Sequence, residues 1–378
     1  MKKLFKKTLL FLSFAVLLFI FDSNSNAASA EELNIATFNI FSKGPNSTGM
    51  SDSRLNSIRN LIRNENLDFI GLQEVDNNNT SKRNIGKNLL SQISDSKTIF
   101  PYQIYGQTLE INGGQYGNGM LTKNRVRGEL VKYLPKEAGA EQRSYQRVVL
   151  EKNGYFVAVY NTHLSHENSD LRKTQIDTLV KLMNNDPIPN KILMGDFNVS
   201  STNELVTFEN NGYKIVKDQN NKFINTFPTN KTTKKPLDFI IVSKNINILN
   251  AETKGTYEHS DHHILKAKIK LSERGDSNLR FENNGQIMFT SDKNGYLIRA
   301  EEYNDNSKRL HAWEYYPDAV YGKHGNQIKY IFDIGSYGNV TNASRRIQGT
   351  KTIDRRYTYY PNAKYGIHGT KIKSSLPN

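Results

Sequence analysis

The 378-residue sequence contains no cysteine. This absence excludes disulfide bonds, thiolate nucleophiles and zinc sites built on cysteine ligands. A chain of this length can bury enough apolar surface to fold without disulfides, and it can form two or three domains. Its 20 tyrosines and 18 phenylalanines supply large core side chains, so the composition is not that of a disordered protein.

Long apolar runs are also scarce. One such run, Leu9 to Phe21, follows four lysines and precedes Ala28-Ser29-Ala30, which fits the small-x-small rule for signal-peptide cleavage. The run is shorter than the roughly 20 residues that span a bilayer, and no other stretch is better suited. We therefore expect residues 1–30 to be a cleaved signal peptide and the mature protein to be secreted. Association of the secreted protein with the cell surface is compatible with this expectation. A retained membrane anchor is the alternative.

The formal net charge is +14, and the excess is spread along the chain instead of forming a basic tail. A broadly positive surface attracts polyanions such as nucleic acid, anionic lipid or wall polymer. Solubility alone is the competing explanation for the charge.

Residues 31–272 show strands alternating with helices, which predicts a layered sheet structure. The polar, turn-rich segment from Ser272 to Asn278 predicts a domain boundary. The expected strands are 33–38, 68–72, 155–160, 191–194, 237–242 and 264–271, and the expected helices are 53–64, about 85–93 and 171–183.

Residues 273–378 contain an internal repeat. "YYPDAVYGKHGNQIKY" begins at Tyr315 and "YYPNAKYGIHGTKIKS" begins at Tyr359, and the copies extend over about residues 294–332 and 338–373. Glycine-rich turns and alternating apolar residues predict β-hairpins, which faintly resemble the YD-type repeats of bacterial surface proteins. We interpret this region as a binding or spacer module whose ligand is an anionic surface or the cell envelope. Its histidines, His311, His324 and His368, are expected to be solvated turn residues.

Polar side chains follow several strands of the first domain at the point where each strand ends. Asn39 closes "IATFN" and Glu74 follows the apolar run "DFIGLQ", so both could bring an oxygen ligand for a hard cation to the sheet edge. His163 ends "VYNTH", and histidine is the side chain best suited to proton transfer near neutral pH. For each residue taken alone, a turn or a solvated strand end is the alternative explanation.

Two further clusters combine carboxylates with an amide or an imidazole. Asp196 and Asn198 follow the strand "KILMG" and should point the same way, toward a phosphate, a water or a metal, unless they form an Asx turn. Asp238 lies within the apolar strand "LDFII", where a carboxylate is costly without a partner. We pair it with His262 of "SDHH", because a carboxylate fixes the tautomer of a histidine and raises its basicity. The neighbouring His263 should point away and belong to packing or the rim.

The strings "IATFNI", "DFIGLQEV", "YNTHLSH", "LMGDFN", "LDFIIVS" and "SDHHIL", in this order, resemble the endonuclease/exonuclease/phosphatase superfamily. That superfamily includes pancreatic-type deoxyribonuclease, apurinic endonucleases, inositol-polyphosphate phosphatases and bacterial sphingomyelinases. The resemblance covers about residues 33–272. It implies a four-layered α/β sandwich, in which two packed mixed β-sheets are flanked by helices, beside the small β-rich C-terminal repeat domain.

The resemblance implies one or two Mg2+ or Mn2+ ions and no cofactor beyond metal. Glu74 is then the metal ligand, with Asn39 beside it and Asp261 as a further ligand. His262, backed by Asp238, is implied to activate the attacking water.

The remaining roles implied by the resemblance concern the phosphate. Asp196 and Asn198 orient the water or the leaving oxygen, and His163 stabilises the developing charge or protonates the leaving group. The implied substrate-binding residues come from "YGNGMLTKNRV" and "EQRSYQRVVLE", and they are Asn118, Arg143 and Arg147.

These features predict a secreted metal-dependent phosphodiesterase, with a nuclease acting on DNA or RNA as the leading hypothesis. A phospholipid phosphodiesterase of the sphingomyelinase type, or another phosphatase, would share every catalytic motif. A non-enzymatic surface-binding or toxin-delivery protein is the alternative from a different class.

Overall fold

The computed structural model describes residues 30–95, 97–186, 188–273, 280–283, 286–292, 294–304, 308–335, 339–366 and 368–378. The predicted signal peptide lies outside the described residues, apart from Ala30. Within these ranges, no helix combines the length and the apolar character that a membrane-spanning helix needs.

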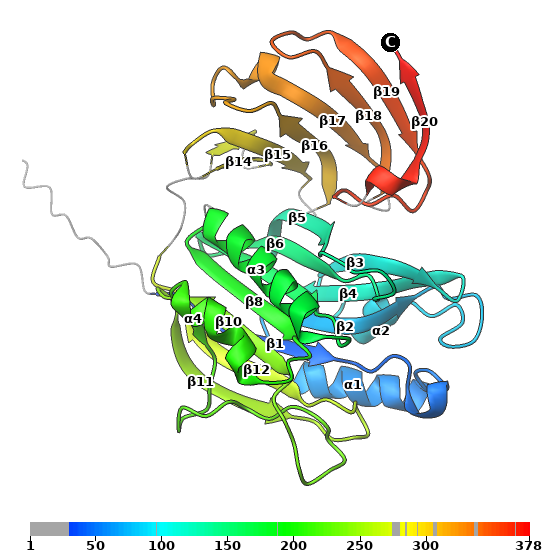
Figure 1. Ribbon diagram of the computed structural model, residues 1–378, viewed down its shortest axis with the longest axis vertical. Helices are drawn as coiled ribbons and strands as arrows, with labels where there is room; N and C mark the ends of the chain where they lie inside the picture. Colours follow the sequence, from blue (N-terminus) through cyan, green and yellow to red (C-terminus); the bar gives the residue numbers. More distant parts are fainter. Residues whose placement is uncertain are drawn as a thin grey trace, which may run out of the picture.

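The first sheet has the strand order β11-β12-β1-β2-β4-β3 (Figure 1). It is mixed, because β1 runs parallel to β2 and antiparallel to β12. Its strands are β1 (Glu32–Asn39), β2 (Phe69–Asn77), β3 (Tyr102–Ile111), β4 (Gly114–Thr122), β11 (Asn247–Lys254) and β12 (Ile264–Lys270). The 3-10 helix η1 (Pro45–Ser47) and the helices α1 (Asp52–Asn64) and α2 (Leu89–Ile93) accompany it.

The second sheet has the order β5-β6-β7-β8-β10-β9 and is also mixed, because β7 and β8 are parallel. Its strands are β5 (Arg125–Tyr133), β6 (Ser144–Lys152), β7 (Tyr155–His163), β8 (Asn190–Asp196), β9 (Tyr213–Ile215) and β10 (Asp238–Ser243). The helices α3 (Ser169–Asn185) and α4 (Val206–Asn210) accompany it, with the 3-10 helix η2 (Thr202–Leu205).

Three buried apolar clusters separate four layers and confirm the predicted sandwich. One joins α1 and α2 to the first sheet, one fills the space between the sheets, and one joins α3 and α4 to the second sheet. The helices start where the sequence offers a cap: the side chain of Ser51 accepts the N–H of Arg54 in α1, and that of Asn168 accepts the N–H of Leu171 in α3. The inner faces of both sheets therefore form one apolar core beneath the strand ends.

The C-terminal residues form an eight-stranded antiparallel sheet in sequential order. Its elements are β13 (Arg280–Glu282), β14 (Ile287–Ser291), β15 (Leu297–Tyr303), β16 (Arg309–Tyr315), η3 (His324–Gln327), β17 (Ile328–Ile334), β18 (Val340–Arg346), β19 (Ile353–Tyr359), η4 (His368–Lys371) and β20 (Ile372–Pro377).

The sequence repeat corresponds to a unit of three strands and one loop. Equivalent loop bonds occur in both copies: the N–H of Leu297 donates to the carbonyl of Ala319 at 2.7 Å, and that of Val340 donates to Ala363 at 2.8 Å. Because an odd number of strands separates the copies in an antiparallel sheet, their loops leave opposite ends of the sheet (Figure 1).

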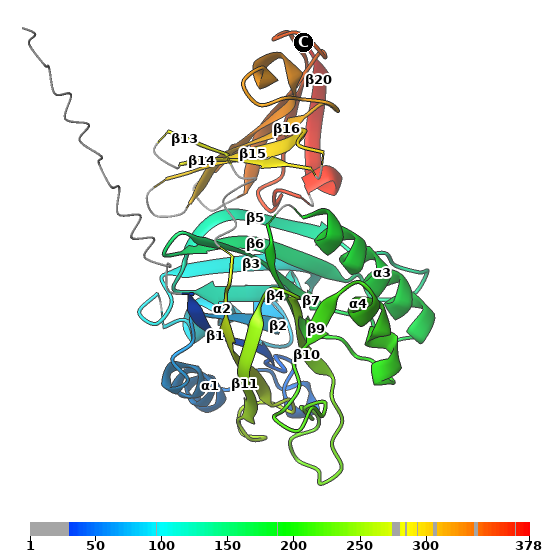
Figure 2. The ribbon, with the colours of Figure 1, turned by 90° about the vertical axis from the view of Figure 1, so that its left-hand side faces the viewer.

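The C-terminal sheet packs on the catalytic domain beside β5 and β6, as the second view shows (Figure 2). Leu130 of β5 packs against the buried cluster of the second repeat, and Glu110 of β3 accepts from Asn362 at 2.5 Å and from Lys371 at 2.7 Å. The loop of the second repeat is thus the docking element. His368 of this loop was predicted to be a solvated turn residue, and this prediction was wrong. Its ring packs 4.7 Å from that of Phe332.

Candidate active site

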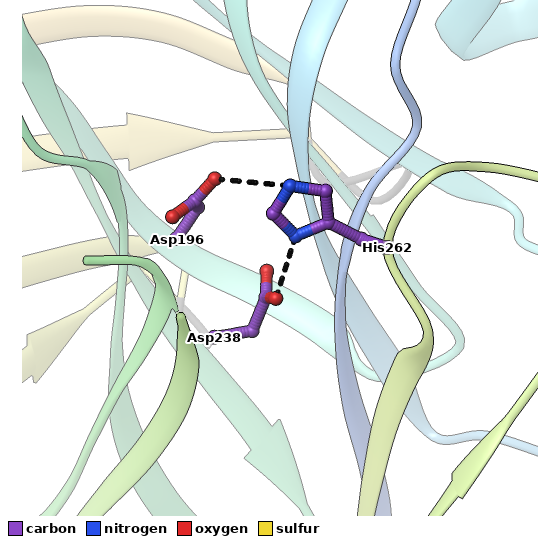
Figure 3. Close-up of side chains that lie close together, drawn as sticks. All are labelled: Asp196, Asp238 and His262. Atoms are coloured by element: carbon purple, nitrogen blue, oxygen red, sulfur yellow. Dashed lines mark hydrogen bonds and ion pairs between the residues drawn. The ribbon is translucent and has the colours of Figure 1, made fainter. Parts of the chain in front are cut away.

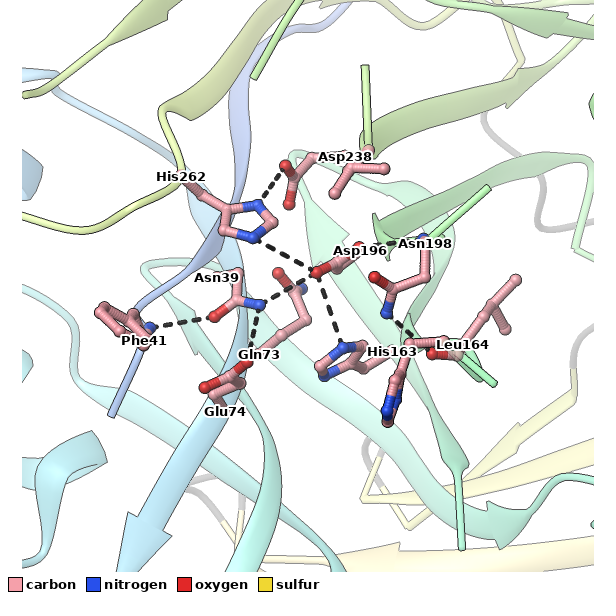
Figure 4. Close-up of polar contacts among 12 residues, drawn as sticks. Asn39, Phe41, Gln73, Glu74, His163, Leu164, Asp196, Asn198, Asp238 and His262 are labelled. Carbon is pink, nitrogen blue, oxygen red and sulfur yellow. Dashed lines mark hydrogen bonds and ion pairs between the residues drawn. The ribbon is translucent and has the colours of Figure 1, made fainter. Parts of the chain in front are cut away.

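The predicted catalytic side chains converge where the strands of both sheets end (Figure 4). Parallel pairing places His163 of β7 next to Asp196 of β8, and antiparallel pairing places Asp196 next to Asp238 of β10. Along their strands these residues continue the rows that bury Val159, Met194 and similar side chains between the sheets. The site is therefore the polar end of the central core.

Asp238 and His262 form the predicted dyad (Figure 3). The Nδ1 atom of His262 lies 2.7 Å from Oδ2 of Asp238, and both residues are buried. Because a carboxylate accepts the Nδ1 proton, the Nε2 atom of His262 faces the site. Ser260 supports this orientation, since its Oγ accepts the N–H of His262 at 3.1 Å and donates to the carbonyl of Asn39 at 2.7 Å.

Asp196 lies between the two histidines. Its Oδ2 atom is 3.7 Å from Nε2 of His262 and 3.6 Å from Nε2 of His163. Its Oδ1 atom accepts the N–H of Asn198 at 3.0 Å, which is the Asx turn that the sequence left open as an alternative. The segment was predicted to be extended, but Asn198 has a φ of 50°, so it turns here. The side chain of Asn198 donates to the carbonyl of Leu164 at 3.1 Å.

Glu74 owes its position to a β-bulge. Between Leu72 and Val75 the register of β2 shifts against β4, so that two residues of β2 oppose the single residue Asn118. Glu74 takes a φ of 58°, which is rare for a residue with a Cβ. Such a strained backbone conformation is tolerated at a bulge that aims a side chain at a site. Asn118, a predicted substrate-binding residue, is buried beside this bulge and donates to the carbonyl of Ser144 at 3.2 Å.

Asn39 links the two carboxylates. Its Nδ2 atom donates to Glu74 at 3.1 Å and to Asp196 at 3.0 Å, while its Oδ1 accepts the N–H of Phe41 at 2.9 Å. A backbone N–H can only donate, so the amide oxygen must face Phe41. In this arrangement Asn39 positions the two carboxylates and its oxygen faces Phe41, while its predicted role as a metal ligand stays a prediction.

The carboxylates crowd one another in a buried space. Burial raises the pKa of Asp196 to about 7. Burial also raises the pKa of Glu74 and of Asp261, and the charge of Asp261 adds to the effect on Glu74. His262 shows the complementary effect: burial opposes its protonation, but Asp238 and Asp196 together raise its pKa to about 10.

A divalent cation fits this donor set. Asp196, Asp238 and His262 each offer one ligand atom, and these atoms lie within 4.8 Å of one another. The Oδ1 atom of Asp238 is buried without a hydrogen-bond partner, and Glu74 and Asp196 share a single amide group. Buried oxygen donors with an excess of negative charge suit a hard cation such as Mg2+ or Mn2+. Because Asp238 and His262 are hydrogen-bonded to each other, Asp196 and Glu74 would hold the cation, with Asp261 near Glu74.

The two predicted arginines have different surroundings. Arg143 is buried beside the site, where it pairs with Glu141 at 3.1 Å and contacts Nδ1 of His166 at 3.0 Å. Burial, and then the charge of Arg143, lowers the pKa of His163 well below its usual value, so this histidine is neutral.

Arg147 does not reach the site, which corrects its predicted role. Its guanidinium makes two bonds to Asp186, at 2.6 and 2.8 Å, and Tyr160 donates to the same carboxylate at 2.6 Å. Arg147 lies within β6, whereas Arg143 precedes this strand. The side chain of Arg147 is on the outer face of the sheet, toward the end of α3. Its function is structural.

A neutral polar layer below the charged groups was not predicted. The Nε2 atom of Gln73 donates to Asn161 at 2.7 Å and to Thr37 at 3.0 Å, and Asn161 donates to Gln146 at 3.1 Å. These side chains are fully buried and join the two sheets directly beneath the site. Amides placed inside otherwise apolar strands, as in "GLQEV" and "VYNTH", were the available signal.

A family model confirms what this geometry indicates. The model of the endonuclease/exonuclease/phosphatase family matches residues 36–262, which contain every candidate catalytic residue described above. The chain belongs to this family and is an enzyme that hydrolyses phosphoester bonds. No curated protein matches the chain.

Solved structures share the fold. An endonuclease/exonuclease/phosphatase from Beutenbergia cavernae matches with a TM-score of 0.54 and 15% identity, covering 92% of this chain and 99% of its own. ANGEL2, a 2',3'-cyclic phosphatase, matches with a TM-score of 0.52 and 13% identity, covering 65% and 96%. A family protein from Bacteroides vulgatus has a TM-score of 0.50 and 18% identity, covering 64% and 99%. The first match extends into the C-terminal sheet.

Proposed function

We propose that this protein is a phosphodiesterase that hydrolyses nucleic-acid backbones with the help of a divalent cation. The observation that carries the proposal is the buried group of Asp196, Asp238 and His262 at the inner strand ends of a phosphoester-hydrolase fold. A carboxylate-backed imidazole beside further carboxylates suits the attack of water on phosphorus.

His262 accepts the proton of the attacking water at Nε2, because its Nδ1 atom is committed to Asp238. Asp196 holds the two histidines at the reacting phosphate, and the neutral His163 donates an N–H to an oxygen of the phosphoryl group or of the leaving group. When bound, a divalent cation supplies positive charge at the carboxylates and polarises the phosphate.

His262 can act as a base only when its proton is released. Without a cation, Asp238 and Asp196 keep it protonated at neutral pH. A positive charge at Asp196 offsets one of these two attractions, so we expect the pKa of His262 to fall when Mg2+ is added. An NMR titration of the histidine, with and without Mg2+, measures this shift.

Two observations support nucleic acid as the substrate. The proposed mature chain keeps a net charge of +11 (+14 minus the +3 of residues 1–30), which attracts polyanions. In addition, the exposed large hydrophobic side chains in the described part of residues 31–272 come from separate segments and form no membrane-inserting hairpin. They are Ile85, Tyr133, Val206, Leu249 and Tyr257. ANGEL2, which shares the fold, is a phosphatase for a 2',3'-cyclic phosphate.

A substrate panel tests the proposal. Purified protein with Mg2+ should cleave DNA or RNA in a gel assay, and a chelator should stop the cleavage. Release of phosphocholine from sphingomyelin, or of phosphate from an inositol phosphate, with nucleic acid left intact, would replace the nuclease by one of the alternatives. Activity that survives His262→Ala would overturn the mechanism.

Export is the second part of the proposal. The lysine-rich start, the apolar run and the Ala28-Ser29-Ala30 site support a cleaved signal peptide, and the C-terminal repeats are suited to an envelope ligand. N-terminal sequencing of protein recovered from culture medium should begin at Glu31.

A further inference from the structure

A lysine-rich loop lies beside the catalytic dyad. Residues 217–237, between β9 and β10, contain five lysines and one aspartate, for a net charge of +4 (five minus one). The segment is the long green loop that extends below the sandwich in Figures 1 and 2. Its second half contains Lys231, Lys234 and Lys235, of which Lys231 and Lys235 are exposed, and Lys235 is bridged to Phe227 at the neck of the loop.

The loop is attached to the catalytic residues themselves. The Oγ1 atom of Thr226 accepts the backbone N–H of Asp238 at 3.1 Å, and the N–H of Thr229 donates to the carbonyl of Asp261 at 2.8 Å. The ring of Phe227 lies 4.8 Å from that of His262. A ligand on this loop would therefore sit next to the reacting phosphate.

His263 fixes one of the lysines in place. Its Nδ1 atom lies 3.0 Å from the carbonyl of Gly255, which can only accept, so Nδ1 carries the proton. Its Nε2 atom is then an acceptor, and it lies 2.9 Å from Nζ of Lys234. His263, predicted to belong to packing or the rim, thus holds an ammonium group one residue away from His262.

Lys231, Lys234 and Lys235 have no acidic partner among the residues that the structure describes. Lys217, at the base of the loop, pairs with Glu209 at 3.3 Å. In contrast, no carboxylate of the described residues lies within ion-pair distance of Lys231, Lys234 or Lys235. Unpaired ammonium groups clustered beside a phosphate site create a local positive field for a polyanion.

We propose that Lys231, Lys234 and Lys235 form a phosphate-binding arm that holds a nucleic-acid strand beyond the scissile bond. This inference rests on the proposed function and adds the surface that selects a polymer over a small phosphate ester. The arm binds backbone phosphates without reading bases, so its contribution depends on salt and not on sequence.

The test compares a triple variant, K231Q/K234Q/K235Q, with a control that removes the same charge elsewhere, K173Q/K181Q/K244Q. The control lysines are on α3 and in the turn after β10, and all three are exposed. Two substrates are used with Mg2+: a DNA duplex and bis(p-nitrophenyl) phosphate, a small diester that has a single phosphate and no neighbouring backbone phosphates.

We expect the arm variant to raise KM for DNA by about 10- to 100-fold and to reduce the slope of log KM against log salt by roughly three, or about one for Lys234→Gln alone. Hydrolysis of the small diester should change by less than about threefold. In the presence of EDTA, fluorescence anisotropy should show the same loss of affinity for labelled DNA.

The outcomes separate the two proposals. If the wild type cleaves DNA and the arm variant behaves like the control, or loses both substrates equally, the arm is wrong and the nuclease stands. If the wild type hydrolyses the small diester but neither binds nor cleaves DNA, the nucleic-acid substrate itself is wrong.

Discussion

Two buried charge clusters in this molecule can be compared. At the active site, Asp196 and Asp238 lie around the single imidazole of His262. At the junction of the domains, Glu301 is buried between two guanidinium groups, with Arg309 at 2.8 Å and Arg299 at 3.5 Å. The first cluster has too many anions, and the second compensates its carboxylate with cations from the same sheet.

The difference separates a functional cluster from a structural one. A buried ion that is fully compensated adds little beyond holding its surroundings in register, whereas an uncompensated cluster is tolerated where chemistry or a ligand requires it. Met288 and Tyr303 of the C-terminal sheet complete apolar clusters of the catalytic domain next to the compensated junction. Loss of charge should therefore affect activity at one cluster and stability at the other.

The largest effect is expected from His262→Ala. Loss of a general base lowers kcat by about 10²- to 10⁴-fold. The substitution also leaves the buried Asp238 without its 2.7 Å partner and should lower stability, so the folded fraction is measured beside the rate. Initial rates on DNA, together with circular dichroism, measure both properties. His311→Ala, on β16 of the C-terminal sheet, is the control and should retain full activity. A stable His262→Ala protein with near-normal rates would contradict the assignment.

Arg309→Ala tests the junction. Removing one partner of a buried pair leaves Glu301 without its 2.8 Å ion pair and should cost about 3–5 kcal/mol of unfolding free energy. Trp313, the single tryptophan of the chain, lies in β16. Its fluorescence therefore reports the unfolding of the C-terminal sheet in urea.

The rate on bis(p-nitrophenyl) phosphate should remain close to that of the wild type under native conditions. Arg345→Ala, which breaks a half-exposed pair with Asp354, is the control and should shift the transition less than Arg309→Ala. Equal shifts of the urea transition for Arg309→Ala and Arg345→Ala would show that the buried charges at the junction contribute no more to stability than a pair elsewhere in the sheet.

Glu74→Gln sharpens the comparison at the active site. Glutamine keeps an oxygen that accepts from Asn39 but removes the charge, so a smaller loss than that of His262 is expected, of about 10²-fold. The Mg2+ concentration needed for half-maximal rate should rise. Glu209→Gln on α4 is the matched control. An unchanged Mg2+ requirement would exclude Glu74 as a ligand.

Local patterns were sufficient to predict the dyad and most of the site. Asp238, His262, His163 and Asp196 each end or begin an apolar run, and runs of this kind determine where strands stop. The bulge at Glu74 could not be predicted, because it depends on the pairing of β2 with β4, which the sequence does not show.

The predicted substrate-binding role of Arg147 was wrong for a related reason. Whether a strand residue faces the site or the outer layer depends on register, and its partner Asp186 is 39 residues away in the chain. The docking of the second repeat loop was also not predicted, because it follows from an odd number of strands per unit, which the spacing of 44 residues alone does not reveal.

The smallest effect concerns pH at the junction, through His368. Burial, and then the charge of Lys132, lowers the pKa of His368 to about 4, while the ring stacks on Tyr365. Above pH 6.5 the histidine is neutral in both the folded and the unfolded chain. As the pH falls from 6.5 toward 4, only the unfolded chain takes up the proton, so stability is lost.

Between pH 7 and pH 5 this loss should be about 1–2 kcal/mol. His368→Gln should lower stability at pH 7 but flatten its pH dependence relative to the wild type, as followed by Trp313 fluorescence. His262 provides the opposite case, because its pKa is raised and it is protonated in the cation-free fold at neutral pH. If His368→Gln and the wild type show equal pH dependence, His368 is not the group that senses acid at the junction.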